Sequence, residues 1–194
     1  MSNNKNEKCC GLVAIIGEPN AGKSTLINRL VGGKVSIVTP KVQTTRFNIR
    51  GVCVHNNSQL VFIDTPGIFE AGKNFEKAMV QAAWSGIGDA DVVLLLLDAT
   101  RGLRENTLQI IDRLKENTKK PVFLLINKVD AVEKAKLFEL ATACNERGNF
   151  AQIFMISALD GDGVADVVAH VAGIVPVHPC LYPAEQMSDI SMLL

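Results

Sequence analysis

Residues 17–24 read Gly-Glu-Pro-Asn-Ala-Gly-Lys-Ser, and this stretch decides the fold. It fits the pattern G-x-x-x-x-G-K-[ST], in which glycines let the backbone bend so that successive N–H groups point at a bound anion. Lys23 is expected to reach the β- and γ-phosphates of a nucleotide, and the Ser24 hydroxyl to ligate Mg²⁺. The nucleotide-binding residues predicted here are Gly17, Pro19, Asn20, Ala21, Gly22, Lys23, Ser24 and Thr25.

The flanking sequence gives this loop the context that phosphate binding requires. Residues 11–16 form a short apolar run typical of a buried strand, and residues 24–31 space their apolar side chains as a helix does. The N-terminus of that helix would then point at the phosphates. This context disfavours a chance glycine turn.

Apolar runs alternate with amphipathic segments along the rest of the chain. We predict an α/β fold of the P-loop NTPase type, with a mostly parallel six-stranded sheet, one antiparallel edge strand and helices on both faces. Ligands of such sheets lie beyond the carboxyl ends of the strands. Further strands are expected at 47–54, 59–63, 91–97, 121–126 and 150–156, and helices at 75–87, 104–117, 132–147 and 162–174.

Composition indicates one soluble domain. The chain has 194 residues, 47% hydrophobic and 21% charged, with a formal net charge of zero that draws it to neither nucleic acid nor an anionic membrane. The cysteines number five and form no C-x-x-C, so reduced thiols are expected rather than a disulfide framework or a zinc site. The most apolar run, 92–97, is far shorter than the roughly 20 residues of a membrane span, so no transmembrane segment is predicted.

Residues 64–67, Asp-Thr-Pro-Gly, follow an expected strand and fit the D-x-x-G element of nucleotide switches. Asp64 is expected to hold Mg²⁺ through a water molecule, and the Gly67 N–H to contact the γ-phosphate. Loss of that phosphate would release the loop that follows, at residues 68–74.

Residues 127–130, Asn-Lys-Val-Asp, follow another strand and would select the base. The Asp130 carboxylate can accept two hydrogen bonds from the N1–H and 2-amino group of guanine, whereas adenine has no such donor pair. Asn127 would contact the base and the nearby loop, and the Lys128 side chain would lie over the ring. After the last strand, a backbone N–H of Ser157, Ala158 and Leu159 would contact guanine O6.

Taken in order, the motifs GEPNAGKS, DTPG, NKVD and SAL resemble the translation-factor-like GTPases and, within them, the Era-type family. Gln-Thr-Thr-Arg at 43–46 and His-Pro-Cys-Leu-Tyr-Pro at 178–183 are also Era-like. The resemblance implies a disordered tail at 1–10, a G domain at 11–175 and a linker at 176–194. That linker would lead toward a KH domain, whose GXXG loop is absent from this sequence.

The resemblance further implies hydrolysis of GTP to GDP and phosphate, as a nucleotide switch in assembly of the small ribosomal subunit. Expected partners are GTP or GDP, the small subunit and its 16S rRNA, the last two mainly through the KH domain. The location would be cytoplasmic, with peripheral association at the inner membrane left open. Ser24, Asp64 and Thr45 would hold Mg²⁺, with Thr44 as the alternative to Thr45. The expected catalytic residues are Lys23, Thr45, Asp64, Gly67 and Asn20.

Ile68 departs from Ras-like GTPases, which carry at this position a glutamine that orients the attacking water. Slow intrinsic hydrolysis is therefore expected. Asn20 suggests a substitute, because related GTPases use this asparagine to help hold K⁺ beside the phosphates, where a cation stabilises the transition state. A slow-turnover sensor of GTP and GDP, and the G domain of a tRNA-modifying GTPase, remain alternatives; Asp130 disfavours an ATPase or kinase.

Overall fold

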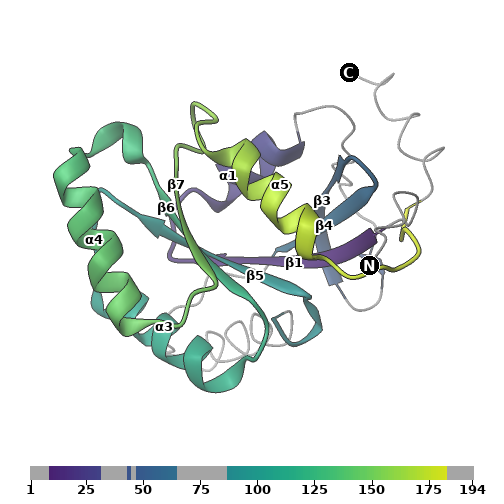
Figure 1. The fold of residues 1–194 in the computed structure, drawn as a ribbon, viewed down its shortest axis with the longest axis horizontal. Coiled ribbons are helices and arrows are strands. Elements are labelled where there is room, and N and C mark those ends of the chain that lie inside the picture. Colours follow the sequence, from purple (N-terminus) through teal and green to yellow (C-terminus); the bar gives the residue numbers. More distant parts are fainter. Residues whose placement is uncertain (1–8, 32–42, 45–46, 65–86, 183–194) are drawn as a thin grey trace, which may run out of the picture.

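The computed structural model describes residues 9–31, 43–44, 47–64 and 87–182, and it is built around one sheet (Figure 1). The strand order is β2-β3-β4-β1-β5-β6-β7. β1, β4, β5, β6 and β7 run parallel, and β3 pairs antiparallel with β4. The strands are β1 (Cys9–Gly17), β2 (Gln43–Thr44), β3 (Phe47–His55), β4 (Ser58–Asp64), β5 (Val92–Asp98), β6 (Val122–Asn127) and β7 (Gln152–Ile156).

Helices cover both faces of the sheet because each carries an apolar stripe. α1 (Lys23–Val31) and α5 (Val164–Ile174) pack on one face, where Leu26 and Val167 join the core. α3 (Glu105–Asn117) and α4 (Lys134–Arg147) pack on the other face. A short 3₁₀ helix, η1 (Val129–Ala131), follows β6. Figure 1 shows α1 and α5 above the sheet, and α3 and α4 below and to the left.

The predicted fold class is confirmed. All six expected strands form, and the two-residue β2 adds to the edge beside β3. The turn between β3 and β4 includes Asn56 in the left-handed conformation, at φ 53°. The helix expected at 75–87 and the loop at 68–74 lie largely or wholly outside the described residues, as does most of the loop expected at 34–46.

The sheet begins earlier than the sequence suggested. The sequence predicts that Cys9 and Cys10 belong to a disordered tail, whereas both lie in β1 and pair with Ser58 and Gln59 of β4. Cys10 is buried, and its backbone N–H donates to the Pro176 carbonyl at 3.2 Å. Backbone groups at this end of β1 are thus paired with β4 and with the chain segment at Pro176.

Residues 176–182, expected to be linker, pack against the domain instead. Val177 forms an antiparallel bridge with Cys9. The Gln59 side chain, 1% exposed, donates from Nε2 to the Tyr182 carbonyl at 2.9 Å and accepts from the Tyr182 N–H at 3.1 Å. An amide side chain therefore pairs with backbone as a neighbouring strand would, and we call residues 176–182 the docked segment.

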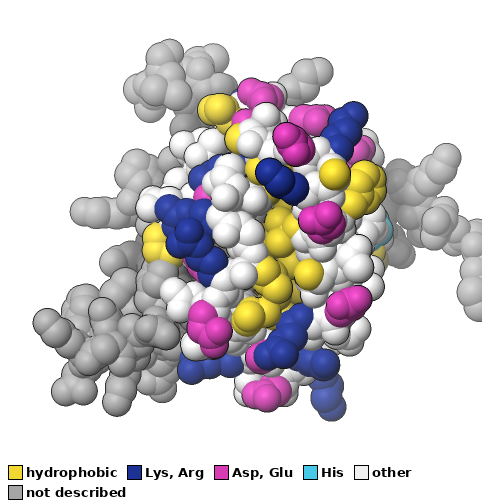
Figure 2. All heavy atoms as spheres, turned by 90° about the vertical axis from the view of Figure 1, so that its left-hand side faces the viewer, with side chains coloured by type: hydrophobic (Ala, Val, Ile, Leu, Met, Phe, Trp, Pro, Cys, Tyr) yellow, Lys and Arg dark blue, Asp and Glu magenta, His cyan; other side chains and the backbone are white. Residues whose placement is uncertain are grey.

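The side of the molecule that carries α3 and α4 is electrically mixed. Figure 2 shows an apolar band flanked by Lys, Arg, Asp and Glu side chains, with neither sign forming a continuous patch. Phe138 of α4 is one of the exposed large apolar side chains. Among the described helices, none has both the length and the apolar character needed to cross a bilayer.

Candidate nucleotide-binding site

The carboxyl ends of the parallel strands bring the predicted motifs to one edge of the sheet. Gly17 at the end of β1 pairs with Leu96 of β5, and Asp98 at the end of β5 pairs with Asn127. Asn127 in turn pairs with Ile156, the last residue of β7. The phosphate loop, the NKVD motif and the SAL motif therefore begin side by side.

The phosphate loop needs glycine at two positions. Gly17 has φ 148° and Gly22 has φ 101°, conformations that L side chains rarely adopt. A Cβ on Gly22 would lie 2.3 Å from Asn127 Nδ2, and one on Gly17 would lie 2.5 Å from the Leu96 carbonyl oxygen. Asn20 also has positive φ, at 61°, which asparagine tolerates better than most residues.

Lys23 is held at the mouth of this loop. Its Nζ donates to the carbonyl oxygens of Gly17 and Glu18, each at 2.8 Å. Ser24 and Thr25 are exposed in the first turn of α1, whose N-terminus favours negative charge. The loop thus combines a fixed cation, a helix terminus and exposed hydroxyls, which suits a phosphate chain with its metal ion.

Asn127 joins three motifs through one buried amide. Its Nδ2 donates to the Ala21 carbonyl at 2.7 Å, and its Oδ1 accepts from the Ala158 N–H at 2.9 Å. The side chain is 2% exposed. The predicted contact of Asn127 with the nearby loop is present. Because the Ala158 N–H already donates to Asn127, its use toward guanine O6 would require that it be shared.

Lys128 adopts a left-handed conformation at φ 67° and turns back toward the phosphate loop. Its Nζ donates to the Asn20 carbonyl at 2.9 Å and to Asp98 Oδ2 at 2.6 Å. Asp130 follows in η1 and is exposed. The carboxylate predicted to select the base is thus accessible, beside a lysine that is fixed in position.

Asp98 is a site residue that sequence reasoning missed. It is 4% exposed, and besides Lys128 it accepts from the Thr100 N–H at 3.0 Å and the Thr100 hydroxyl at 2.6 Å. Burial acts to raise the pKa of this carboxyl, but hydrogen bonds from Lys128 and Thr100 outweigh it, so the pKa lies below its ordinary value. The missed signal was its position, since Asp98 ends a core strand as Asp64 and Asn127 do.

Two further contacts support the phosphate loop from the face covered by α3. The Thr107 hydroxyl, in a side chain 2% exposed, donates to Glu18 Oε1 at 2.6 Å. Arg101 Nη1 donates to the Pro19 carbonyl at 3.4 Å. The x positions of the loop motif, which carry no constraint in the pattern itself, are therefore tied to the scaffold.

Some predicted site residues lie outside the described part of the chain. Thr45 and Gly67 belong to this group. Thr44 lies in β2, and Asp64 ends β4 with its backbone paired to Ile15. The backbone of Asp64 thus ends at the same edge of the sheet as the phosphate loop.

Comparison with known proteins shows which family the chain belongs to. A family model described as 50S ribosome-binding GTPase matches residues 12–128. The chain belongs to this family. The match to this GTPase family covers the phosphate loop, DTPG and the first two residues of NKVD.

Two curated relatives of this chain are Era proteins. GTPase Era of Mesorhizobium japonicum is 52% identical over 182 residues, which are 94% of this chain and 58% of the relative. GTPase Era of Afipia carboxidovorans is 54% identical over 180 residues, 93% of this chain and 58% of the relative. The chain therefore spans less than two thirds of these relatives, and the predicted resemblance to Era-type GTPases is confirmed.

Two solved Era structures resemble this GTPase domain closely. An Aquifex aeolicus Era variant bound to GDP and AlF₄⁻ is 37% identical with a TM-score of 0.76, over 90% of this chain and 60% of that one. An Era in complex with MgGDPNP and nucleotides 1506–1542 of 16S ribosomal RNA is 38% identical with a TM-score of 0.77, over 91% and 60%. The fold is thus the one on which those proteins hold guanine nucleotides.

Proposed function

We propose that this chain is the G domain of an Era-type GTPase, which binds GTP with Mg²⁺ and hydrolyses it to GDP and phosphate. The observation that carries this proposal is the Asn127 amide, which contacts the phosphate loop at Ala21 and, at Ala158, the loop of residues 157–161, which we call the base loop. A phosphate subsite and a base subsite are thereby held on one scaffold. Asp130, exposed beside them, supplies the specificity for guanine.

The phosphate loop and the first turn of α1 would bind the phosphates. Lys23 would exchange its contacts with loop carbonyls for phosphate oxygens, and loop N–H groups would donate to the same phosphates. Ser24, Asp64 and Thr45 would hold Mg²⁺, which would neutralise negative charge on the phosphates when bound. Water would be the nucleophile, and the Gly67 N–H would contact the γ-phosphate.

The NKVD motif and the base loop, at the other end of the site, would bind guanine. Asp130 accepts from N1–H and the 2-amino group, and the Lys128 side chain covers one face of the ring. Adenine would leave the Asp130 carboxylate without its donor pair. A backbone N–H of the motif Ser157, Ala158 and Leu159 would contact O6.

For the whole protein that contains this domain, we propose a nucleotide switch in assembly of the small ribosomal subunit. The 16S rRNA segment in the solved Era complex supports this role. Contact with RNA would fall mainly to a KH domain outside this sequence. A cytoplasmic location, with or without peripheral association at the inner membrane, belongs to the same proposal. The Era relatives disfavour the alternative of a tRNA-modifying GTPase.

Substitution of Asp130 tests the base assignment. Asp130→Asn should weaken GDP binding by at least about tenfold and strengthen binding of xanthosine diphosphate, because the asparagine amide can donate to the xanthine 2-oxo group. Fluorescent-nucleotide titration measures both affinities. Asp112→Asn, at an exposed carboxylate of α3, is the control. Unchanged affinities for both nucleotides in Asp130→Asn would contradict the proposal.

Asn20 is the basis of a finer proposal, that K⁺ beside the phosphates accelerates hydrolysis. Asn20 is exposed on the loop and already holds the left-handed conformation. GTP hydrolysis should be faster in KCl than in NaCl at matched ionic strength. Asn20→Gly, which preserves that conformation, should remove the difference but keep GDP binding. Equal rates for the wild type in the two salts would refute K⁺ activation.

Ile68 favours one alternative, a sensor of GTP and GDP with negligible turnover. Single-turnover phosphate release at saturating protein separates the two functions. An enzyme releases phosphate within the assay and faster with K⁺. A sensor releases none with either salt while it retains guanine specificity.

A further inference from the structure

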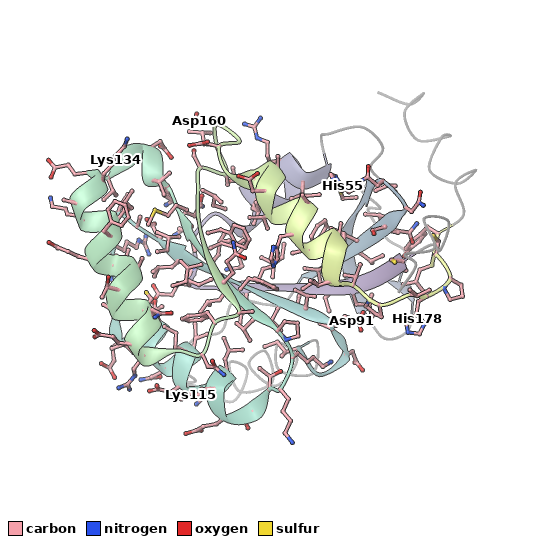
Figure 3. The ribbon with its side chains drawn as sticks, viewed as in Figure 1. His55, Asp91, Lys115, Lys134, Asp160 and His178 are labelled. Atoms are coloured by element: carbon pink, nitrogen blue, oxygen red, sulfur yellow. The ribbon has the colours of Figure 1, made fainter. Side chains whose placement is uncertain are left out.

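Arg29, in the last turn of α1, reaches across to the loop that follows β7. Its Nε donates to the Ala158 carbonyl at 3.3 Å, and its Nη2 donates to the Leu159 carbonyl. Asp160, labelled in Figure 3, marks the same loop at the top of the view, near α1. One guanidinium thus binds two consecutive carbonyls of the base loop.

The side chain also lies flat against the loop. A Cβ placed on Gly161 would lie 3.6 Å from Arg29 Cδ and Nε and 3.7 Å from Cζ. Gly161 has φ 95°, so the chain turns sharply where the guanidinium packs. The arginine therefore contacts both the start of the base loop and its turn.

The base loop depends on such backbone contacts because its tip has little apolar packing. Leu159 is 66% exposed. Within the loop, the Gly161 N–H donates to the Ser157 carbonyl at 2.7 Å. Toward the sheet, the Ala158 N–H donates to Asn127. Arg29 adds the attachment to α1, whose first residues bind phosphate in the proposed function.

We propose that Arg29 is a positioning residue for guanine recognition. It holds residues 157–161 in the conformation in which a backbone N–H of the Ser157–Leu159 motif faces O6, without itself contacting the nucleotide. This inference rests on the proposed function and deepens it. The chemistry is suited to the task, because a guanidinium donates through several N–H groups in a fixed plane, whereas a lysine ammonium is a mobile point charge.

If the loop is already ordered before the nucleotide binds, less conformational entropy is lost on binding. The effect of Arg29 should therefore appear in contacts to O6 and not in contacts to phosphate. 6-Thioguanosine 5′-diphosphate keeps the diphosphate, the N1–H and the 2-amino group but carries sulfur, a weak hydrogen-bond acceptor, in place of O6. Comparing it with GDP isolates the part of binding that the base loop provides.

The test measures affinities of both nucleotides for wild type, Arg29→Ala, Arg29→Lys and Arg147→Ala. Arg147→Ala is the matched control, since that arginine pairs with Asp112 on the opposite face of the sheet. Arg29→Ala should weaken GDP binding by about tenfold, comparable to loss of one charge-assisted hydrogen bond, and binding of the 6-thio analogue by less than about twofold. Arg29→Lys should recover part of the loss, and Arg147→Ala should behave as wild type.

Single-turnover phosphate release from the saturated complex should be unchanged in Arg29→Ala, because Arg29 does not touch the reacting atoms. Equal weakening of both nucleotides would identify a general role in stability and overturn the inference, as would unchanged GDP affinity. If the alanine variant does not fold, Arg29→Gln and Arg29→Lys provide the same comparison. A wild type without preference for GDP over ADP would refute the proposed function itself, which separates the two failures.

Discussion

Lys128 Nζ lies 2.6 Å from Asp98 Oδ2 and 2.9 Å from the Asn20 carbonyl oxygen. The lysine of the base motif is therefore fixed between β5 and the phosphate loop. Asp98 is nearly fully buried, whereas Lys128 keeps about a third of its side chain exposed, at 35%. The ammonium is thus positioned by the protein and remains accessible to a base.

Removal of the Asp98 charge should loosen this arrangement. Asp98→Asn should weaken GDP binding several-fold and lower the free energy of unfolding by about 1–2 kcal/mol, because the Lys128 ammonium loses its anionic partner. The partial exposure of Lys128 keeps this figure below that of a fully buried pair. Chemical denaturation and nucleotide titration measure the two effects. Asp112→Asn, which breaks an exposed ion pair, should change neither; equal stabilities of the two variants would contradict the assignment.

The same carboxylate predicts a dependence of stability on pH. The pKa of Asp98 is lowered in the folded state from an ordinary value of 3.8, so the folded protein binds this proton less readily than the unfolded chain. Its contribution is therefore complete above that ordinary value and is lost as pH falls through the folded-state pKa. The difference in unfolding free energy between wild type and Asp98→Asn should be constant from about pH 5 to 7 and shrink below about pH 4. A difference that grew on acidification would refute this.

Gly22→Ala should disable the phosphate loop. The residue has φ 101°, and the added methyl would lie 2.3 Å from Asn127 Nδ2, so both the loop and the amide bridge must shift. GDP affinity should fall more than about tenfold, with a loss of stability of about 1–3 kcal/mol. Gly173→Ala is the control, because open space surrounds Gly173 in α5. It should stabilise the protein by about 0.5–1 kcal/mol and leave nucleotide binding intact.

Gln59→Leu should release the docked segment. The substitution removes both hydrogen bonds to Tyr182, and the leucine places an apolar side chain of similar volume at this buried position. Cys180, half-buried in that segment, should then react several-fold faster with a maleimide, as followed by peptide mass spectrometry. Gln152→Leu, at an exposed position of β7, should leave the rate unchanged.

An internal reference is available for that experiment. Burial raises the pKa of the Cys144 thiol to about 11, so this cysteine should stay unreactive in every variant. Labelling of Cys144 would indicate global opening of the fold. An unchanged Cys180 rate in Gln59→Leu would show that other contacts hold the docked segment.

Periodicity and motif order were enough to predict the sheet, its parallel strands and the edge where the motifs meet. Buried parallel strands are nearly continuous apolar runs, as at 92–97, and such runs are easy to recognise. The polar residue that ends each run then marks the binding edge. This reasoning located Asn127 and Lys128 correctly beside the phosphate loop.

The contacts that the sequence could not predict are those that side chains make with residues far away along the chain. Arg29 and Ala158 are 129 positions apart, and Thr107 and Glu18 are 89 apart. No local pattern distinguishes such an arginine or threonine from a solvated one. The docked segment was missed for a related reason, since no local pattern shows that the side-chain amide of Gln59 forms hydrogen bonds with the distant backbone of Tyr182.

The docked segment and the nucleotide site lie at opposite ends of the same strands. Gln59 lies near the start of β4 and Asp64 at its end, about 17 Å apart for an extended strand. In Figure 3, His178 of the docked segment and Asp160 of the base loop mark these two poles. A signal from the proposed γ-phosphate subsite would therefore have to cross the whole sheet to reach the docked segment.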